Sequence, residues 1–180
     1  MRTSILSICI LSISCSLASA QTGVNELQVQ KSVNNEAMAL AQRMKSIDGN
    51  DSISIAFSVD TFRIERTMEL RLEQESNTHA MNAQMENATE AYDKLLNRYY
   101  QQLLKILQGE DKKTLITAQR AWIAFRDAEL SMIGTAGKEQ YSGGGTMQSN
   151  INAASYLDLV KQRTVQIFNH LDRASTATQN

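Results

Sequence analysis

Apolar residues recur at three- and four-residue steps through most of the chain, the spacing typical of amphipathic helices. The spacing predicts a helix over 24–46 and a long helical stretch from Asp60 or Thr61, either of which can act as N-cap, to about Gln108. Gly109 is expected to end this stretch. Its strongest stripe, within 78–107, consists of Met81, Met85, Ala88, Tyr92, Leu95, Tyr99 and Ile106.

Two more helices are predicted after Gly109. Asp111 can cap the first, which extends to about Ile133, and the second spans 147–171. Between them, residues 134–145 form the clearest loop, since five of the eight glycines fall there. The apolar stripes consist of Leu115, Ala118, Trp122, Phe125 and Met132 in the first helix, and of Ile151, Ala154, Leu157, Val160, Ile167, Phe168 and Leu171 in the second.

The segment before Asp60 has a different pattern. Four apolar residues alternate with serine and alanine: Ile53, Ile55, Phe57 and Val59. A period of two indicates a strand, but no partner strand is predicted. An extended segment lying against helices, or the start of a helix, fits equally well.

Together these elements predict an all-α fold, an antiparallel helical bundle with a long central helix and a Gly-rich loop before the last helix. The sequence contains no proline, the residue that most often breaks helices. We divide the chain into an N-terminal helix and variable segment (21–60), a helical domain (61–172) and a polar tail expected to fray (173–180).

Residues 1–20 have the three parts of a secretory signal peptide. Arg2 is followed by an apolar stretch over 5–17 and by Ala18-Ser19-Ala20, a small-x-small cleavage site. The apolar stretch is shorter than the about 20 residues that span a membrane, so no stable membrane span is expected. A buried first helix would not explain the cleavage site. We therefore expect cleavage after Ala20 and a periplasmic or secreted protein.

Both cysteines, Cys9 and Cys15, lie in this removable segment. Cys15 could carry a lipid, but the leucine-like residue expected three positions upstream is missing, so a lipoprotein is disfavoured. The mature chain would then have no disulfide, no thiol nucleophile and no thiolate ligand, although export would permit disulfides.

Charge and motifs argue against several functions. The formal charge of −1 becomes −2 without Arg2, and no basic cluster indicates nucleic-acid binding. His79 and His170 lack metal-ligand spacing, a G-x-S-x-G elbow is absent, and the glycines at 143–145 are not followed by the Lys-Ser/Thr of a phosphate loop. We therefore expect no catalytic residues, no metal and no cofactor; the protein is not expected to be an enzyme.

The segment AQRAWIAFRDAE (118–129) is the most informative. Trp122 and Phe125 are expected on one side of a helix, with Gln119, Arg126 and Glu129 along its edge. An arginine beside aromatic rings can stack on a ring and pair with a carboxylate. We favour a structural role, with Trp122 packed inside and Arg126 bonded to Glu129 or a neighbouring helix, over direct ligand binding.

Four segments resemble the LprI-like family of small exported helical proteins of bacteria, named for a lysozyme inhibitor: 81–104, 118–129, YSGGGT (141–146) and 159–171. The resemblance gives a motif of Gln119, Trp122, Phe125, Arg126, Asp127, Glu129 and Arg163. It also implies cysteines at the positions of Gln84, Leu130 and Ser155, so this chain resembles a cysteine-free branch.

The resemblance implies a binding protein whose partner is lysozyme or another peptidoglycan hydrolase. A partner-binding site is expected in the Gly-rich loop, at Tyr141, Gly143, Gly144, Gly145 and Thr146, because glycines allow close approach and tyrosine anchors interfaces. The alternative, that the glycines serve only to turn the chain between two helices, is slightly favoured. Two other functions stay open: a non-inhibitory envelope interaction or stress module, and an immunity protein against a wall-degrading toxin.

Overall fold

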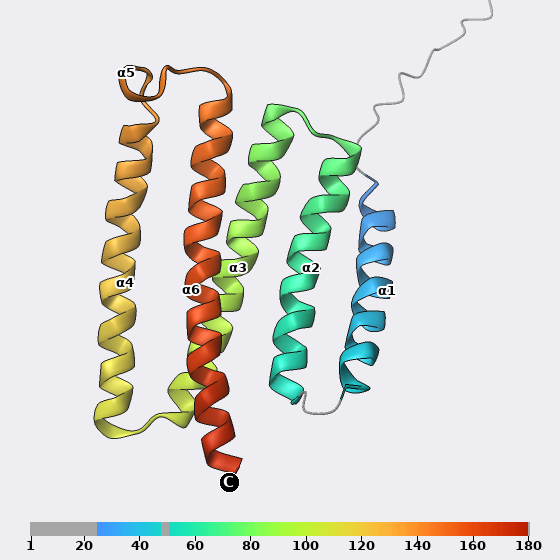
Figure 1. Ribbon diagram of the computed structural model, residues 1–180, viewed down its shortest axis with the longest axis vertical. Coiled ribbons are helices and arrows are strands. Elements are labelled where there is room, and N and C mark those ends of the chain that lie inside the picture. The colour runs from blue at the N-terminus through green and yellow to red at the C-terminus, as the bar shows by residue number, and fades with distance from the viewer. Residues whose placement is uncertain (1–24, 48–50, 180) are drawn as a thin grey trace, which may run out of the picture.

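The structure is a computed structural model that describes residues 25–47 and 51–179 (Figure 1). The predicted signal peptide, its expected cleavage site and both cysteines lie outside the described residues, as do residues 48–50. The described residues form helices only. These are α1 (Glu26–Lys45), α2 (Ser52–Gln74), α3 (Thr78–Ile106), α4 (Gly109–Ala136), the short α5 (Glu139–Ser142) and α6 (Met147–Gln179).

The long helices stand side by side in the order α4, α6, α3, α2, α1 (Figure 1). Consecutive long helices run antiparallel, and the predicted all-α bundle is confirmed. Helices α3 and α6 are not consecutive and run parallel, because the chain goes up through α4 before it returns. Figure 1 shows α4 and α1 at the two edges of the molecule and α3 and α6 at its centre.

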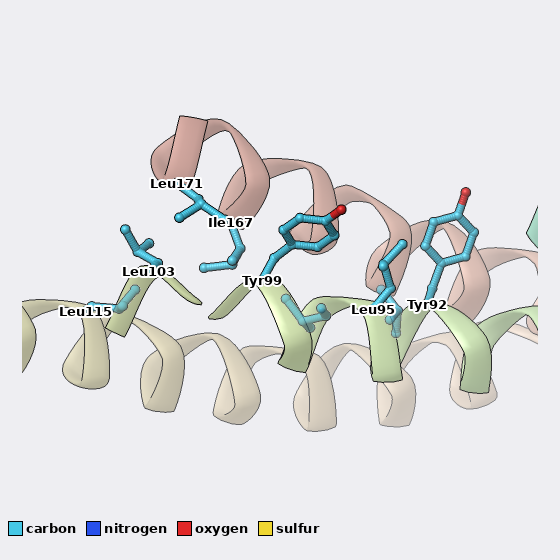
Figure 2. Close-up of a cluster of buried hydrophobic side chains, with 9 residues drawn as sticks. Tyr92, Leu95, Tyr99, Leu103, Leu115, Ile167 and Leu171 are labelled. Atoms are coloured by element: carbon cyan, nitrogen blue, oxygen red, sulfur yellow. The ribbon is translucent and has the colours of Figure 1, made fainter. Parts of the chain in front are cut away.

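The core lies where α3 meets α6 (Figure 2). The stripe predicted in 78–107 supplies one side of it, since its side chains fall on one face at helical spacing. Phe57 of α2 stacks on Phe168 of α6 with ring centroids 3.9 Å apart, and Tyr99 meets both rings edge-on. The buried residues of this cluster are Tyr92, Leu95, Leu96, Tyr99, Leu103, Leu115, Val160, Ile167 and Leu171.

The hydroxyl groups of Tyr92, Tyr99 and Thr164 in this core each have a partner that offsets their burial. The Tyr92 hydroxyl donates to Glu65 Oε1 at 2.6 Å, and the same carboxylate pairs with Lys161. The Tyr99 hydroxyl donates to Asp60 Oδ2 at 3.2 Å. Thr164 Oγ1 donates to the carbonyl oxygens of Val160 and Tyr92, at 2.9 and 3.3 Å. These bonds link α2, α3 and α6 through groups that the sequence pattern alone does not pair.

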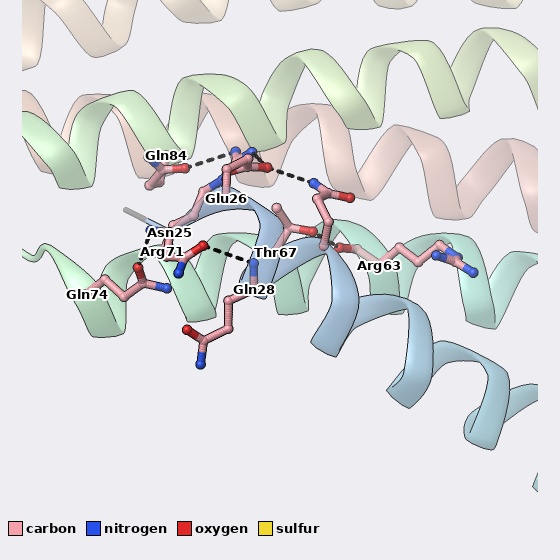
Figure 3. Close-up of polar contacts among 9 residues, drawn as sticks. Asn25, Glu26, Gln28, Arg63, Thr67, Arg71, Gln74 and Gln84 are labelled. Atoms are coloured by element: carbon pink, nitrogen blue, oxygen red, sulfur yellow. Dashed lines mark hydrogen bonds and ion pairs between the residues drawn. The ribbon is translucent and has the colours of Figure 1, made fainter. Parts of the chain in front are cut away.

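Helix α1 packs on α2 through a narrow stripe of Val29, Val33 and Ala37, all buried. Polar contacts fasten its first turn to the end of α2 (Figure 3). Arg71 donates to Glu26 Oε1 at 2.7 Å and to Gln84 Oε1 at 3.3 Å, so one guanidinium links α1, α2 and α3.

The segment 52–59 is the start of α2, so the strand and the extended segment are both wrong. Asp51 accepts a hydrogen bond from Ser54 N at 2.7 Å and caps this helix, which explains why it begins before Asp60. Asp60 and Thr61 are not N-caps. Asp60 lies inside α2, where it pairs with Arg98 of α3 at 2.6 Å.

Other helix limits also differ from the prediction. The stretch from Asp60 is interrupted after Gln74, and Asn77 caps α3 by accepting from Ala80 N at 2.9 Å. Gly109 does not end α3 but begins α4, and Asp111 lies in the first turn rather than at the cap. Helix α6 continues to Gln179, so the tail over 173–179 is helical.

Candidate functional site

Helix α4 is the least buried long helix of the bundle. Of its residues only Leu115 is buried, and it joins the core cluster near the end of α3. Phe125 and Met132, which were expected on the buried stripe, are 53% and 57% exposed. That expectation was wrong because apolar residues are spread around α4, so no single face collects them.

Trp122 packs the middle of α4 against the core of the bundle. The Arg126 guanidinium lies 5.5 Å from the centroid of its ring and the Arg163 guanidinium lies 5.8 Å from it, within the range of cation–π contacts. Arg163, from α6, also donates from Nε to Gln119 Oε1 at 3.0 Å. Three motif residues on α4 and one on α6 therefore form one cluster.

Two details of the motif differ from the expectation. Arg126 donates from Nε and Nη2 to Asp127 Oδ1, at 2.9 and 2.7 Å, and not to Glu129. Phe125 is 53% exposed and lies outside the core cluster, whereas Trp122 packs against that cluster. The contact between α4 and α6 therefore consists of four of the seven motif residues, Gln119, Trp122, Arg126 and Arg163.

The end of the α4–α6 hairpin carries the second group of predicted residues. We call α5 together with residues 143–146 the tip. All three glycines of the tip have positive φ (76°, 74° and 97°), a conformation that side chains rarely adopt. Gly144 N donates to Ser142 Oγ at 3.1 Å, which closes the turn. Tyr141 is 66% exposed and Thr146 is exposed as well.

The structure brings the five predicted partner-binding residues together at the tip, but it separates them from the motif. Trp122 lies about 21 Å along the axis of α4 from the end of that helix at Ala136, at 1.5 Å per residue. Met147 and Ile151, 72% and 50% exposed, continue the exposed apolar surface from the tip onto α6. Sequence reasoning missed this extension because it assigned Ile151 to the buried face.

Sequence reasoning also missed a hollow of about 520 Å³ at the opposite end of the hairpin, between α3, α4 and α6. Burial lowers the pKa of Arg163, which contributes to its wall. Little in the sequence indicates this hollow, because its lining includes the small side chains of Ala118 and Ala174, which come from two different helices. Its lining residues are Leu103, Leu107, Asp111, Thr114, Leu115, Ala118, Arg163, His170, Arg173 and Ala174.

Within the described ranges, no three His, Cys, Asp or Glu residues are grouped so that they could hold a metal ion. None of the helices in that part of the chain is both long and apolar enough to cross a membrane. The arrangement offers surfaces for binding: the exposed tip, the hollow and the flank of α4.

The fold and the site define a class of protein, a small all-helical protein in which most of the exposed large apolar residues of the described part lie on one helical hairpin. The chain belongs to the family described as lysozyme inhibitor LprI, whose model matches residues 71–167, just over half of the chain. The matched range holds α3, α4 and α5 and most of α6, and leaves out α1. No curated protein and no solved structure matches the chain.

Proposed function

We propose that the protein is exported and that it binds and inhibits a peptidoglycan-cleaving muramidase of the lysozyme type. The observation that carries this proposal is the family match over 71–167, because the family is described by lysozyme inhibition. The matched range includes all of α4 and the whole tip. The signal-peptide pattern in 1–20 supports a site of action outside the cytoplasm.

The tip is the surface that we assign to the muramidase. It stands at one end of the bundle, and Figure 1 shows α5 and the loop after it above α4 and α6. Tyr141 offers an exposed aromatic ring, and three residues without Cβ let a partner approach the backbone closely. A protruding segment of this kind suits a concave partner surface, and the substrate cleft of a muramidase is concave.

An inhibition assay with the purified mature chain, residues 21–180, tests the proposal. Lysis of a cell-wall suspension by lysozyme should slow at near-equimolar amounts of the protein, and a one-to-one complex should elute from a sizing column at micromolar concentration. Unchanged lysis together with no complex contradicts the proposal.

Substitution at the tip tests the location. Tyr141→Ala should weaken inhibition at least tenfold, because the ring is the largest exposed apolar group of the tip. Leu27→Ala is the matched control, since Leu27 is 85% exposed and lies on α1 at the other edge of the bundle. Both variants should keep the melting temperature of the unmutated protein. Equal inhibition by both would move the contact away from the tip.

Deleting two of the glycines Gly143, Gly144 and Gly145 gives a second test. The shortened loop cannot reproduce three consecutive positive φ angles, so the orientation of α5 changes. Inhibition should fail while the far-ultraviolet circular dichroism spectrum is retained. Full inhibition by the shortened protein would show that the glycines serve only to turn the chain.

A further inference from the structure

The hollow between α3, α4 and α6 has an apolar interior. Leu103 and Leu115 are buried, and Leu107 lies between them where α3 turns into α4. Its volume of about 520 Å³ is within the range of small-molecule sites, about 300–1,000 Å³. The three helices give it walls on several sides, so an aliphatic chain placed there would be partly removed from water.

The charges around the hollow are mainly positive. Arg163 and Arg173 of α6 contribute positive charge and Asp111 of α4 contributes negative charge, and the ring of His170 also lines the hollow. Arg163 is less exposed than Arg173, and its Nε and Nη1 donate to the neutral amides of Gln119 and Gln166 at 3.0 and 3.2 Å. Among the residues that the structure describes, no carboxylate pairs with Arg163 or Arg173.

This lack of a carboxylate distinguishes Arg163 from three other partly buried arginines but is shared with Arg63, which donates to Asn34 Oδ1. Arg66, Arg71 and Arg126 have side chains that are 22–25% exposed, and each pairs with at least one carboxylate. A half-buried guanidinium without a counter-charge is costly, because burial disfavours the charged form. An anion bound beside Arg163 would remove part of that cost.

We propose that this hollow binds one molecule of a fatty acid, an amphiphile with a carboxylate head and an unbranched aliphatic chain. The carboxylate lies at Arg163 and Arg173, where a guanidinium can donate two parallel hydrogen bonds to its oxygens. The aliphatic chain lies against Leu103, Leu107 and Leu115. The concave shape favours a single free molecule over the flat surface of a bilayer, and this binding is independent of muramidase inhibition.

The single tryptophan of the chain reports binding directly. Trp122 touches the Arg163 guanidinium, so an anion that draws Arg163 toward the hollow changes the surroundings of the indole ring. Dodecanoate, titrated below its micelle-forming concentration at pH 7, should change the emission of Trp122 with one-to-one stoichiometry and a micromolar dissociation constant. Dodecanol, which has the same chain without the charge, should bind at least tenfold more weakly.

Two substitutions on α4 test the place of binding. Ala118→Phe fills the hollow and should abolish dodecanoate binding, whereas Ala124→Phe adds the same ring at an exposed alanine that does not line it and should leave binding unchanged. Arg173→Gln and Arg163→Gln should each weaken dodecanoate binding, the second at least tenfold, and leave dodecanol binding as it was. If Ala118→Phe does not fold, the arginine variants and the dodecanol comparison decide.

Three results would overturn the proposal. The first is no change in emission and no heat of binding with dodecanoate at about 0.1 mM. The second is equal affinity for dodecanol and dodecanoate, or binding that survives both arginine substitutions. The third is binding only to vesicles of phosphatidylglycerol and phosphatidylethanolamine, which would assign the charges to a membrane surface. None of these results affects the inhibition assay, so the two proposals can fail separately.

Discussion

Helices α3 and α4 are nearly the same length, 29 and 28 residues, but α3 has eight buried residues and α4 has one. The difference lies in where the apolar side chains fall. In α3 they form one continuous stripe that faces α6, whereas in α4 they are spread around the axis and leave Ile123, Phe125 and Met132 exposed. The comparison indicates that α3 holds the fold together, whereas most of the surface of α4 stays exposed to solvent.

The largest effect is expected in α3. Leu95→Ala removes a side chain that is 1% exposed at the contact with α6, and we expect a loss of about 2–5 kcal/mol in the free energy of unfolding from lost burial and the cavity left behind. Urea unfolding followed by circular dichroism measures it. A loss below about 1 kcal/mol would contradict the assignment of the core to α3.

Trp122→Ala is the matching change in α4. The ring is half-buried between two guanidiniums, so we expect a loss of about 2 kcal/mol, below the about 3–5 kcal/mol of a fully buried tryptophan. The same urea experiment measures the loss. A loss of free energy of unfolding as large as that of Leu95→Ala would mean that Trp122 contributes as much to stability as a fully buried residue of α3.

The buried tyrosines of α3 predict a loss of stability at alkaline pH. Burial raises the pKa of Tyr92 and Tyr99, and the carboxylates of Glu65 and Asp60 act in the same direction. Because the folded pKa is above the unfolded value of about 10, the contribution is complete below pH 10 and is lost as the pH rises above it. The slope is at most about 1.4 kcal/mol per pH unit for each tyrosine.

A comparison of variants isolates this effect from the titration of lysines. Urea midpoints at pH 9 and pH 11 should differ less in Tyr92→Phe than in the unmutated protein. Tyr141→Phe, at the exposed tip, should keep the full difference. The interpretation fails if Tyr92→Phe and Tyr141→Phe lose the same stability over this range.

The smallest effect is expected on the outer flank of α4. Phe125→Ala should change the free energy of unfolding by less than about 0.5 kcal/mol, because the ring is 53% exposed and lies outside the core cluster. Urea unfolding again measures it. A loss above about 1.5 kcal/mol that grows with protein concentration would show instead that a second copy of the chain covers this ring in solution.

The sequence was enough to predict the all-α fold and the core face of α3. The spacing of Tyr92, Leu95 and Tyr99 fits a helix with one apolar face and does not fit a strand. The sequence could not resolve α2, where Ser54 and Ser58 interrupt the apolar positions and make a helix resemble a strand. The capping role of Asp51, which settles the question, depends on a single side-chain bond.

The candidate site was predictable only in part. The tip residues are neighbours in sequence, so their proximity followed from the loop. The partners of Arg163 could not be predicted in this way, because Gln119 and Trp122 lie on another helix. The contact of α4 with α6 depends on how the whole bundle packs. The hollow beside Arg163 was not predictable for the same reason, since a gap between three helices has no pattern of its own.

The parallel contact between α3 and α6 has a consequence for how the chain folds. Thr164 donates a hydrogen bond to the carbonyl oxygen of Tyr92, 72 positions away. The contact between α3 and α6 therefore closes a loop of the chain that contains α4 and the tip. Helices α1, α2 and α3 meet through neighbours in sequence and need only short loop closures. We expect α6 to dock last, as the slow step, and substitutions at its core face to change the folding rate more than substitutions in α1.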